Sequence, residues 1–317
     1  MARFIPLLPR RIFVTFAESV GALAYALDRR GREIALGNLE CVFGDRFSPE
    51  RRQEIARASY ENFARTMLSL FWVTRLSPEN YREWIQVVGY DASQDAIRNW
   101  QGGGGPVFPC AHFGNWEWAN HGGAYIGYVA TTVAEDFKNP RLTAIFKSLR
   151  EHSGATLISQ NSALLRMLRA TKQGKTTSLM VDLNLPPTQA STIIEAFRSE
   201  GGGEGLLMSV PILHAVLVQR IGGPLIPATA EPLPDGGCLL RLHPVVPVAP
   251  DDTPQQIAQK CWDVFEPLVR ERPELYLWSY KHYRYRPKDA RRRYPAYSNV
   301  NGKFEKLRKE VARSAQG

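Results

Sequence analysis

A histidine and a glutamate five residues apart form the pair of side chains in this sequence best suited to proton transfer. His112 follows an apolar run, and Glu117 comes after a glycine and an asparagine at positions 114 and 115. Residues at i and i+5 point to different sides of one helix, so His112 must precede the helix that carries Glu117 if the two are to meet. The carboxylate can then hold one imidazole nitrogen while the other acts as a general base.

The elements that would position this pair can be predicted locally. Residues 107–111 are predicted to form a buried strand, Gly114 and Asn115 a tight turn, and the next residues a helix with Asn115 as N-cap. Glu117 then lies in the first turn, where its charge suits the helix dipole. A structural interpretation stays open beside the catalytic one: His112 could be a buried histidine satisfied by the helix cap.

Composition describes an ordinary globular protein. The 317 residues are 44% hydrophobic and 22% charged, which is enough for one large core or two small domains. The four cysteines form no C-x-x-C pair and no zinc spacing, so we expect unpaired thiols in a reducing compartment and no metal site. There is no internal repeat and no low-complexity linker.

Short strands and helices alternate after about residue 85. This alternation predicts an α/β fold with a largely parallel central sheet flanked by helices. Residues before it read as a helical N-terminal extension, and the amphipathic helix expected over 49–73 reads as core-facing, without chemistry. The predicted strands cover 85–88, 107–111, 128–133, 155–158 and 176–182.

The two ends of the chain suggest a surface partner. An apolar run over 12–27 contains Glu18 and is bounded by arginines, which is short and polar for a spanning helix but typical of an interfacial one. Residues 281–317 hold twelve Lys and Arg against three acids, a balance of +9, which suits an anionic lipid surface or a nucleic acid. We therefore expect a membrane-associating helix over 1–32, a catalytic domain over 33–288 and a basic tail over 289–317. A helix packed on the protein's own core and a solvated tail are the alternatives.

Three blocks of sequence resemble a known family. They are the Asn-Leu pair at 38–39, the run His-Phe-Gly-Asn-Trp-Glu at 112–117, and the aromatic and basic segment at 272–287. The second resembles the His-x4-Asp/Glu motif of glycerolipid-type acyltransferases. Together they look most like the late lauroyl and myristoyl acyltransferases of bacterial lipid A biosynthesis and the phosphatidylinositol-mannoside acyltransferases. The fit of the last block to this family makes nucleic-acid binding a minority interpretation.

The resemblance implies an activity and its setting. The expected enzyme moves a fatty acyl chain from acyl carrier protein or coenzyme A to a hydroxyl of a membrane glycolipid such as a lipid A precursor, without a cofactor. His112 would be the base and Glu117 its orienting partner, and the backbone at Gly114 and Asn115 would meet the oxyanion. The implied location is the cytoplasmic face of the bacterial inner membrane.

Three further residues are candidates for substrate binding by the same resemblance. Arg150, followed by a glycine four residues later, would clamp a phosphate or a pantetheine arm; a surface salt bridge is the alternative. Glu135 stands where many lipid A enzymes have an arginine, and Asp182 matches the family while Leu183 does not. The loop 199–205 also departs from the family pattern. Three alternatives remain: another lipid acceptor, a hydrolase that uses water, and a catalytically decayed peripheral membrane protein.

Overall fold

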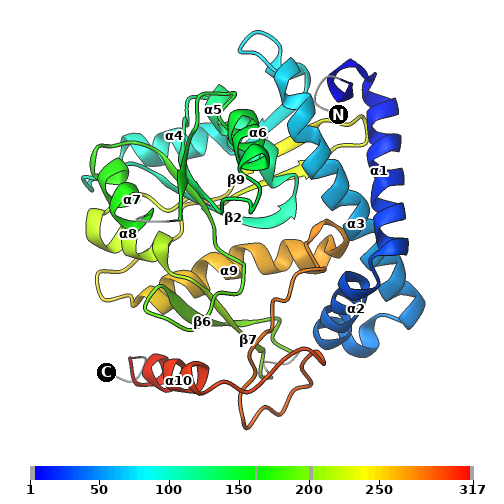
Figure 1. Cartoon of the computed structure of the whole chain (residues 1–317). Coiled ribbons are helices and arrows are strands. Elements are labelled where there is room, and N and C mark those ends of the chain that lie inside the picture. The colour runs from blue at the N-terminus through cyan, green and yellow to red at the C-terminus, as the bar shows by residue number, and fades with distance from the viewer. Residues whose placement is uncertain (1–3, 161–162, 200–202, 315–317) are drawn as a thin grey trace. The chain divides into compact units, whose positions relative to one another are not determined.

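The computed structural model describes residues 4–160, 163–199 and 203–314 (Figure 1). The chain forms two compact units. The first comprises Met1–Val20, Glu61–Met180 and Leu217–Pro247, and the second comprises Gly21–Tyr60, Val181–Val216 and Val248–Gly317. Three helices contribute residues to both units: α1 (Arg10–Leu27), α3 (Pro49–Trp72) and α8 (Leu213–Ile221).

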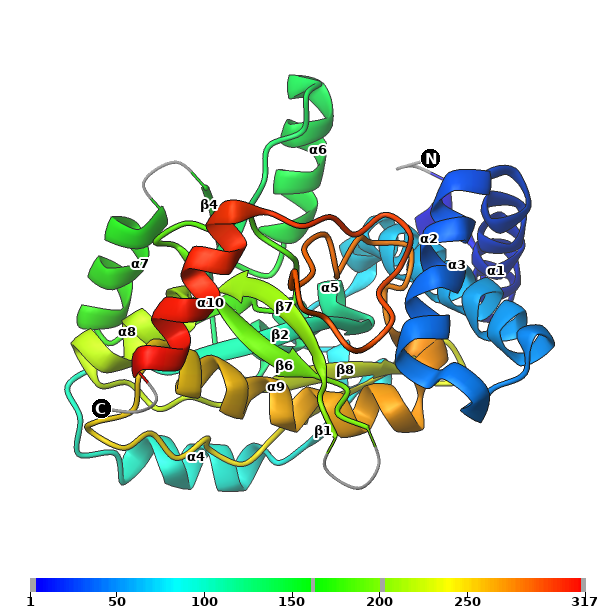
Figure 2. The same cartoon turned by 90° about the horizontal axis from the view of Figure 1, so that it is seen from below.

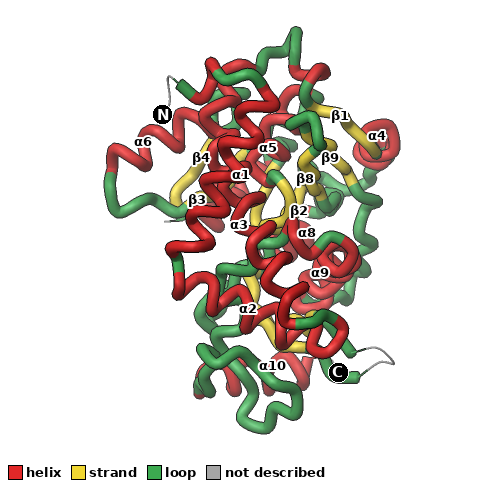
Figure 3. Tube along the Cα trace, turned by 90° about the vertical axis from the view of Figure 1, so that its right-hand side faces the viewer, coloured by secondary structure: helices red, strands yellow, loops and turns green. Residues whose placement is uncertain are grey.

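A seven-stranded sheet forms the centre of the first unit, in the order β1-β9-β8-β2-β5-β3-β4 (Figure 3). β8 and β9 are antiparallel, and the other neighbouring pairs are parallel. β2 lies near the middle and is buried along its whole length except at His112, as expected for an apolar strand covered on both faces. The strands are β1 (Ile85–Val88), β2 (Val107–Gly114), β3 (Thr131–Ala134), β4 (Thr156–Ser159), β5 (Thr177–Met180), β8 (Ala228–Pro232) and β9 (Cys238–Leu242).

Helices cover this sheet and complete its core. α5 packs on β2, β8 and β9, and α7 packs on β3, β4 and β5. Aromatic rings seal the contact between α3 and α5, where Trp72 and Trp118 have ring centroids 5.9 Å apart. The helices that lie wholly in this unit are α4 (Tyr90–Arg98), α5 (Trp116–Tyr125), α6 (Pro140–Arg150) and α7 (Ala163–Lys172).

The second unit is built on a two-stranded antiparallel ribbon of β6 (Ser191–Ala196) and β7 (Leu206–Pro211). α9 (Pro254–Glu271) and α10 (Gly302–Ser314) both pack on β6, and α2 (Arg29–Phe43) belongs to the same unit (Figure 2). The start of α9 is capped on both sides: Thr253 and Gln256 form a reciprocal capping box. The core of the second unit is aromatic. The buried rings are those of Phe43, Phe197, Trp262, Tyr276 and Trp278.

The predicted α/β class, with a mostly parallel sheet and a helical N-terminal region, is confirmed. The details differ in several places, and the strands predicted over 128–133 and 176–182 are observed as β3 (Thr131–Ala134) and β5 (Thr177–Met180). β2 continues to Gly114 instead of stopping at 111, and β8 with β9 adds an antiparallel pair inside the sheet. The antiparallel pair could not be expected from alternation alone, because its two strands are joined directly without a crossover helix.

The structure adds two details to the expected helix and tail near the ends of the described chain. The predicted boundary at residue 32 falls inside α2, which starts after Asp28 accepts a hydrogen bond from the Gly31 N–H. In the basic tail, Phe304 of α10 is completely buried. Among the residues that the structure describes, no helix has both the length and the apolar content to cross a bilayer.

Candidate active site

The end of β2 brings His112 to a turn that only glycine can make. The register between β2 and β8 shifts between Cys110 and Gly114, which is typical of a bulge that re-aims a side chain. Gly114 has φ of +65°, and a Cβ added there would lie 2.1 Å from the Ala230 carbonyl oxygen. The predicted turn is therefore present, and its glycine is required by both conformation and space.

Polar side chains of α3 form hydrogen bonds with this turn. Asn62 Nδ2 and Thr66 Oγ1 both donate to the Gly114 carbonyl oxygen, at 3.1 and 3.0 Å. Asn115 Nδ2 donates to Ser69 Oγ at 3.1 Å. All of these groups are buried, so the turn that follows His112 is fixed in a water-poor environment where each hydrogen bond matters.

Asn115 is the N-cap of α5, as predicted. Its Oδ1 accepts a hydrogen bond from the Trp118 N–H at 3.2 Å, and the side chain is buried. Its own backbone N–H donates to the Ala230 carbonyl oxygen at 2.6 Å. These contacts give Asn115 a positioning role; substrate contact by Gly114 or Asn115 stays a prediction.

Glu117 is bound at both carboxylate oxygens by Arg150. Arg150 Nε donates to Oε2 at 3.0 Å and Nη2 donates to Oε1 at 2.6 Å, which is a two-pronged ion pair. The side chains are 8% exposed at Glu117 and 20% at Arg150. Burial opposes the charge of Arg150, but the neighbouring Glu117 raises the pKa of the guanidinium above its usual value.

This pair joins two residues that are 33 positions apart in the sequence and lie on different helices. Arg150 ends α6, Glu117 opens α5, and the two helices are in contact (Figure 1). Glu117 thus has two sources of positive potential, the guanidinium and the N-terminus of α5. Each carboxylate oxygen keeps a second lone pair, so the ion pair leaves the carboxylate able to accept a hydrogen bond from an imidazole as well.

His112 lies half-buried beside an aromatic ring. The centroids of His112 and Trp116 are 5.0 Å apart at an interplanar angle of 61°, an edge-to-face contact that limits how the imidazole can turn. The ring centroids of Trp116 and Phe63, a residue of α3, are 6.1 Å apart. His112 therefore lies near the end of β2, next to aromatic side chains of α3 and α5.

The remaining predicted substrate residues lie in different settings. Glu135 directly follows β3 and is exposed. Since β2, β5 and β3 are parallel neighbours, Glu135 and His112 both lie toward the carboxyl edge of the sheet, where α/β folds bind ligands. Asp182 belongs to the second unit and is completely buried. Burial raises the pKa of Tyr276 far above its usual value. The nearby Asp182, which accepts a hydrogen bond from the Tyr276 hydroxyl, raises this pKa further.

Two buried histidines contrast with His112. His121 and His214 are fully buried, and burial lowers their pKa values to about 3 and about 4. His121 Nδ1 lies 2.8 Å from Ser153 Oγ. Both imidazoles are therefore neutral parts of the core.

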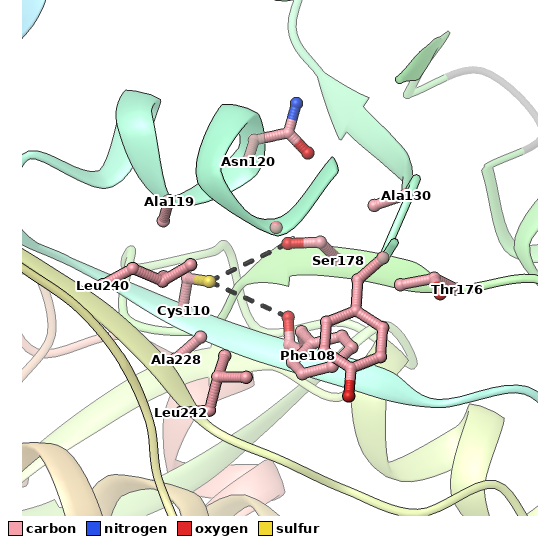
Figure 4. Close-up of a pocket in the computed structure, with 12 residues that line it drawn as sticks. Phe108, Cys110, Ala119, Asn120, Ala130, Thr176, Ser178, Ala228, Leu240 and Leu242 are labelled. Atoms are coloured by element: carbon pink, nitrogen blue, oxygen red, sulfur yellow. Dashed lines mark hydrogen bonds between the residues drawn. The ribbon is translucent and has the colours of Figure 1, made fainter. Parts of the chain in front are cut away.

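A small cavity lies between β2 and α5 (Figure 4). Its volume of about 20 Å³ suits one water molecule and is far too small for an acyl chain. Cys110 points into this region with its sulfur 3.8 Å from Ser178 Oγ, and it is buried, as are the three other cysteines. The cavity therefore belongs to the packing beneath the site.

Sequence reasoning missed the supporting residues of the site. The pairing of Arg150 with Glu117 carries no local signal, because the two residues lie on different helices. The α3 contribution did leave a signal: Asn62, Thr66 and Ser69 recur at helical spacing on a face that is otherwise apolar. Buried polar residues at that spacing require partners, and here the partners are the turn and the cap of the site.

A half-buried histidine at a strand end, with a carboxylate in the first turn of the next helix of an α/β fold, is the arrangement expected of the His-x4-Asp/Glu acyltransferases. A family model described as bacterial lipid A biosynthesis acyltransferase matches residues 1–285. The chain belongs to this family and is thus an acyltransferase. Comparison with curated proteins gave no match.

Proposed function

We propose that the protein transfers a fatty acyl chain from a thioester of acyl carrier protein or coenzyme A to a hydroxyl of a membrane glycolipid such as a lipid A precursor. The family match supports acyl transfer in lipid A biosynthesis. The observation that carries the proposed mechanism is the position of His112 at the end of β2, ahead of a turn whose far side presents Glu117.

In this mechanism one imidazole nitrogen of His112 takes the proton of the acceptor hydroxyl as its oxygen attacks the thioester carbonyl carbon. The carbon–sulfur bond then breaks, and the leaving thiolate takes the proton back from the imidazolium. Glu117 orients the ring and stabilises its positive form. Because the thioester is already activated, the reaction requires no cofactor.

The ion pair with Arg150 refines the role of that arginine. Its Nε and one Nη donate hydrogen bonds to Glu117. The role that we propose for Arg150 is therefore to hold the carboxylate of Glu117 in position. The remaining N–H groups leave room for a contact to a donor phosphate, as the sequence suggested. Glu135, exposed at the carboxyl edge of the sheet, is our candidate for contact with the acceptor.

Membrane attachment is part of the proposal, at the cytoplasmic face of the bacterial inner membrane. α1 exposes Ile12, Phe16, Leu23 and Leu27. Their spacing places them along one face of the helix, which is the pattern of a helix that lies in an interface. The anionic surface would be contacted by the basic C-terminal segment as well.

Mass spectrometry of membrane lipids tests the acceptor. Cells with and without the protein should differ by one acyl chain on a glycolipid, with little change in free fatty acid. A gain of free fatty acid without an acylated lipid would indicate a hydrolase, and acylation of a phospholipid or mannoside lipid would replace the lipid A acceptor by another. Unchanged lipids together with an inert purified protein would indicate a decayed site.

A further inference from the structure

The second unit contains a basic cleft that the transfer mechanism does not use. Its volume is about 470 Å³, within the range of small-ligand sites. Three cationic side chains line it, Arg30, Lys281 and Arg284, together with Tyr280, Tyr285 and Tyr297. No acidic residue is among its lining residues.

The frame of this cleft is fixed by hydrogen bonds within the second unit. Asn38 Nδ2 of α2 donates to the carbonyl oxygens of Trp278 and Tyr280, both at 2.8 Å. The Tyr297 hydroxyl donates to Asn38 Oδ1 and also accepts from the Tyr283 N–H. A buried asparagine thus joins α2 to both sides of the segment that follows α9, so the cleft is formed before any ligand arrives.

The same hydrogen-bonded segments of the chain carry the cationic side chains. Arg30 and Ile34 are four residues apart on α2 and so share one face, and both line the cleft. The backbone of Arg284 is tied to Asn299, whose N–H donates to the Arg284 carbonyl oxygen at 3.0 Å. Because ordered backbone carries these side chains, little entropy remains to be lost when a ligand binds.

Within the described ranges, the three cations of the cleft make no close ion pair, although Arg30 interacts electrostatically with the carboxylate of Asp28. In the part of the chain that the structure describes, none of the three cations takes part in a salt bridge. Lys281 and Arg284 contact aromatic faces instead, at 5.3 Å from the Tyr297 ring and 5.4 Å from the Tyr280 ring. The Nε of Arg284 is buried and, among the described residues, has no hydrogen-bond partner. A buried donor without a partner is costly unless a ligand or water satisfies it.

We propose that this cleft binds a phosphate group. Three cations around one concavity create a positive potential that attracts a small anion, and guanidinium donors match phosphate oxygens. The tyrosine faces can receive the sugar or other polar body that carries the phosphate. The phosphate can come from a lipid headgroup or from a soluble ester, and the chemistry of recognition is the same for both.

Direct binding to the full-length protein tests this proposal without any turnover. Inorganic pyrophosphate, titrated by calorimetry, is the soluble probe. Phosphatidylcholine vesicles with and without phosphatidic acid, tested by co-sedimentation, are the lipid probe. The test variant is Lys281→Gln with Arg284→Gln, and the control is Arg169→Gln with Lys172→Gln, which removes the same charge from exposed positions on α7.

We expect pyrophosphate affinity to fall by about tenfold or more in the test variant and to stay unchanged in the control, since each lost contact is a charge-assisted hydrogen bond. Loss of binding to phosphatidic acid vesicles as well would assign the phosphate to a lipid headgroup. Vesicle binding that is retained would assign it to a soluble ester.

Arg30→Gln provides a second variant that is safe for folding, because Arg30 is exposed. It should weaken pyrophosphate binding by a smaller factor in the same direction. Equal affinity in all variants, or an equal loss in the α7 control, would overturn the proposal. So would a single-stranded oligonucleotide that binds through these residues while pyrophosphate does not.

Discussion

At the scale of single residues, the proposed mechanism requires the carboxylate of Glu117 to interact with both Arg150 and His112. Arg150 binds both oxygens of Glu117, and Glu117 stands in the first turn of α5 just after the turn that follows His112. In the proposed mechanism, Arg150 therefore acts on the reaction through the carboxylate of Glu117. This makes its geometry more important than its charge, because a lysine can supply the charge but not two parallel hydrogen bonds.

Arg150→Lys is expected to lower catalytic efficiency by about tenfold or more, equivalent to about 1.4 kcal/mol. If Arg150 positions Glu117, the loss should appear mainly in kcat, and Arg150→Lys should add little to Glu117→Gln. If it also clamps the donor, KM should rise too. Arg141→Lys, an exposed arginine on the same helix, is the matched control. Wild-type kinetics in Arg150→Lys would reduce the pair to a structural salt bridge.

At the scale of elements, the junction of β2 and α5 is the central device. Its local features were predictable because they depend on neighbouring residues only. These features are the apolar run, the glycine, the asparagine cap and the acidic residue in the first helical turn. The strand's continuation to Gly114 was not, because it follows from pairing with β8, which lies more than a hundred residues later. The same limit applies to Arg150 and to the polar face of α3, whose partners are distant in sequence.

Gly114→Ala tests this junction. The added methyl would collide with the Ala230 carbonyl and demand a left-handed conformation, so we expect a loss of about 1–3 kcal/mol in stability, with activity reduced in the folded protein. Gly103→Ala is the control, because a Cβ there meets nothing within 4 Å. Thermal unfolding of the two variants should differ by several degrees. Equal melting temperatures would show that the turn can relax.

At the scale of the whole molecule, buried neutral histidines connect stability with pH. The pKa values of His121 and His214 are about 3 and about 4 in the folded chain, below the unfolded value of about 6.5. The unfolded chain therefore binds more protons between these values, and stability must fall as pH drops below about 6.5. Each histidine can contribute a slope of up to roughly 1.4 kcal/mol per pH unit.

Chemical denaturation from pH 7.5 to 5 measures this slope. His214→Leu should flatten it, because in the described part of the chain neither nitrogen of His214 has a hydrogen-bond partner to lose. An unchanged slope in that variant would show that other groups control the acid limb.

Attachment to a membrane also belongs to this scale. Serine at the four exposed apolar positions of α1 should abolish co-sedimentation with anionic vesicles, because the apolar face is lost at little cost to the core. Lys309→Gln with Arg313→Gln should only weaken binding, by up to about 1 kcal/mol per charge, and leave it less dependent on salt. These point changes are preferable to truncation, since Phe304 of α10 is buried. Pelleting of the serine variant in high salt would disprove anchoring by α1.

Turnover per folded molecule in His112→Ala tests the central claim most directly. Thioester-dependent acylation of lipid is measured, and the rate is divided by the folded fraction from thermal unfolding, with His152→Ala as an exposed-histidine control. We predict a loss of about 100- to 10,000-fold, the usual contribution of a general base, and a double variant with Glu117→Gln scarcely worse than His112→Ala alone. Near-normal turnover in folded His112→Ala would contradict the mechanism and leave the histidine a structural part of the turn.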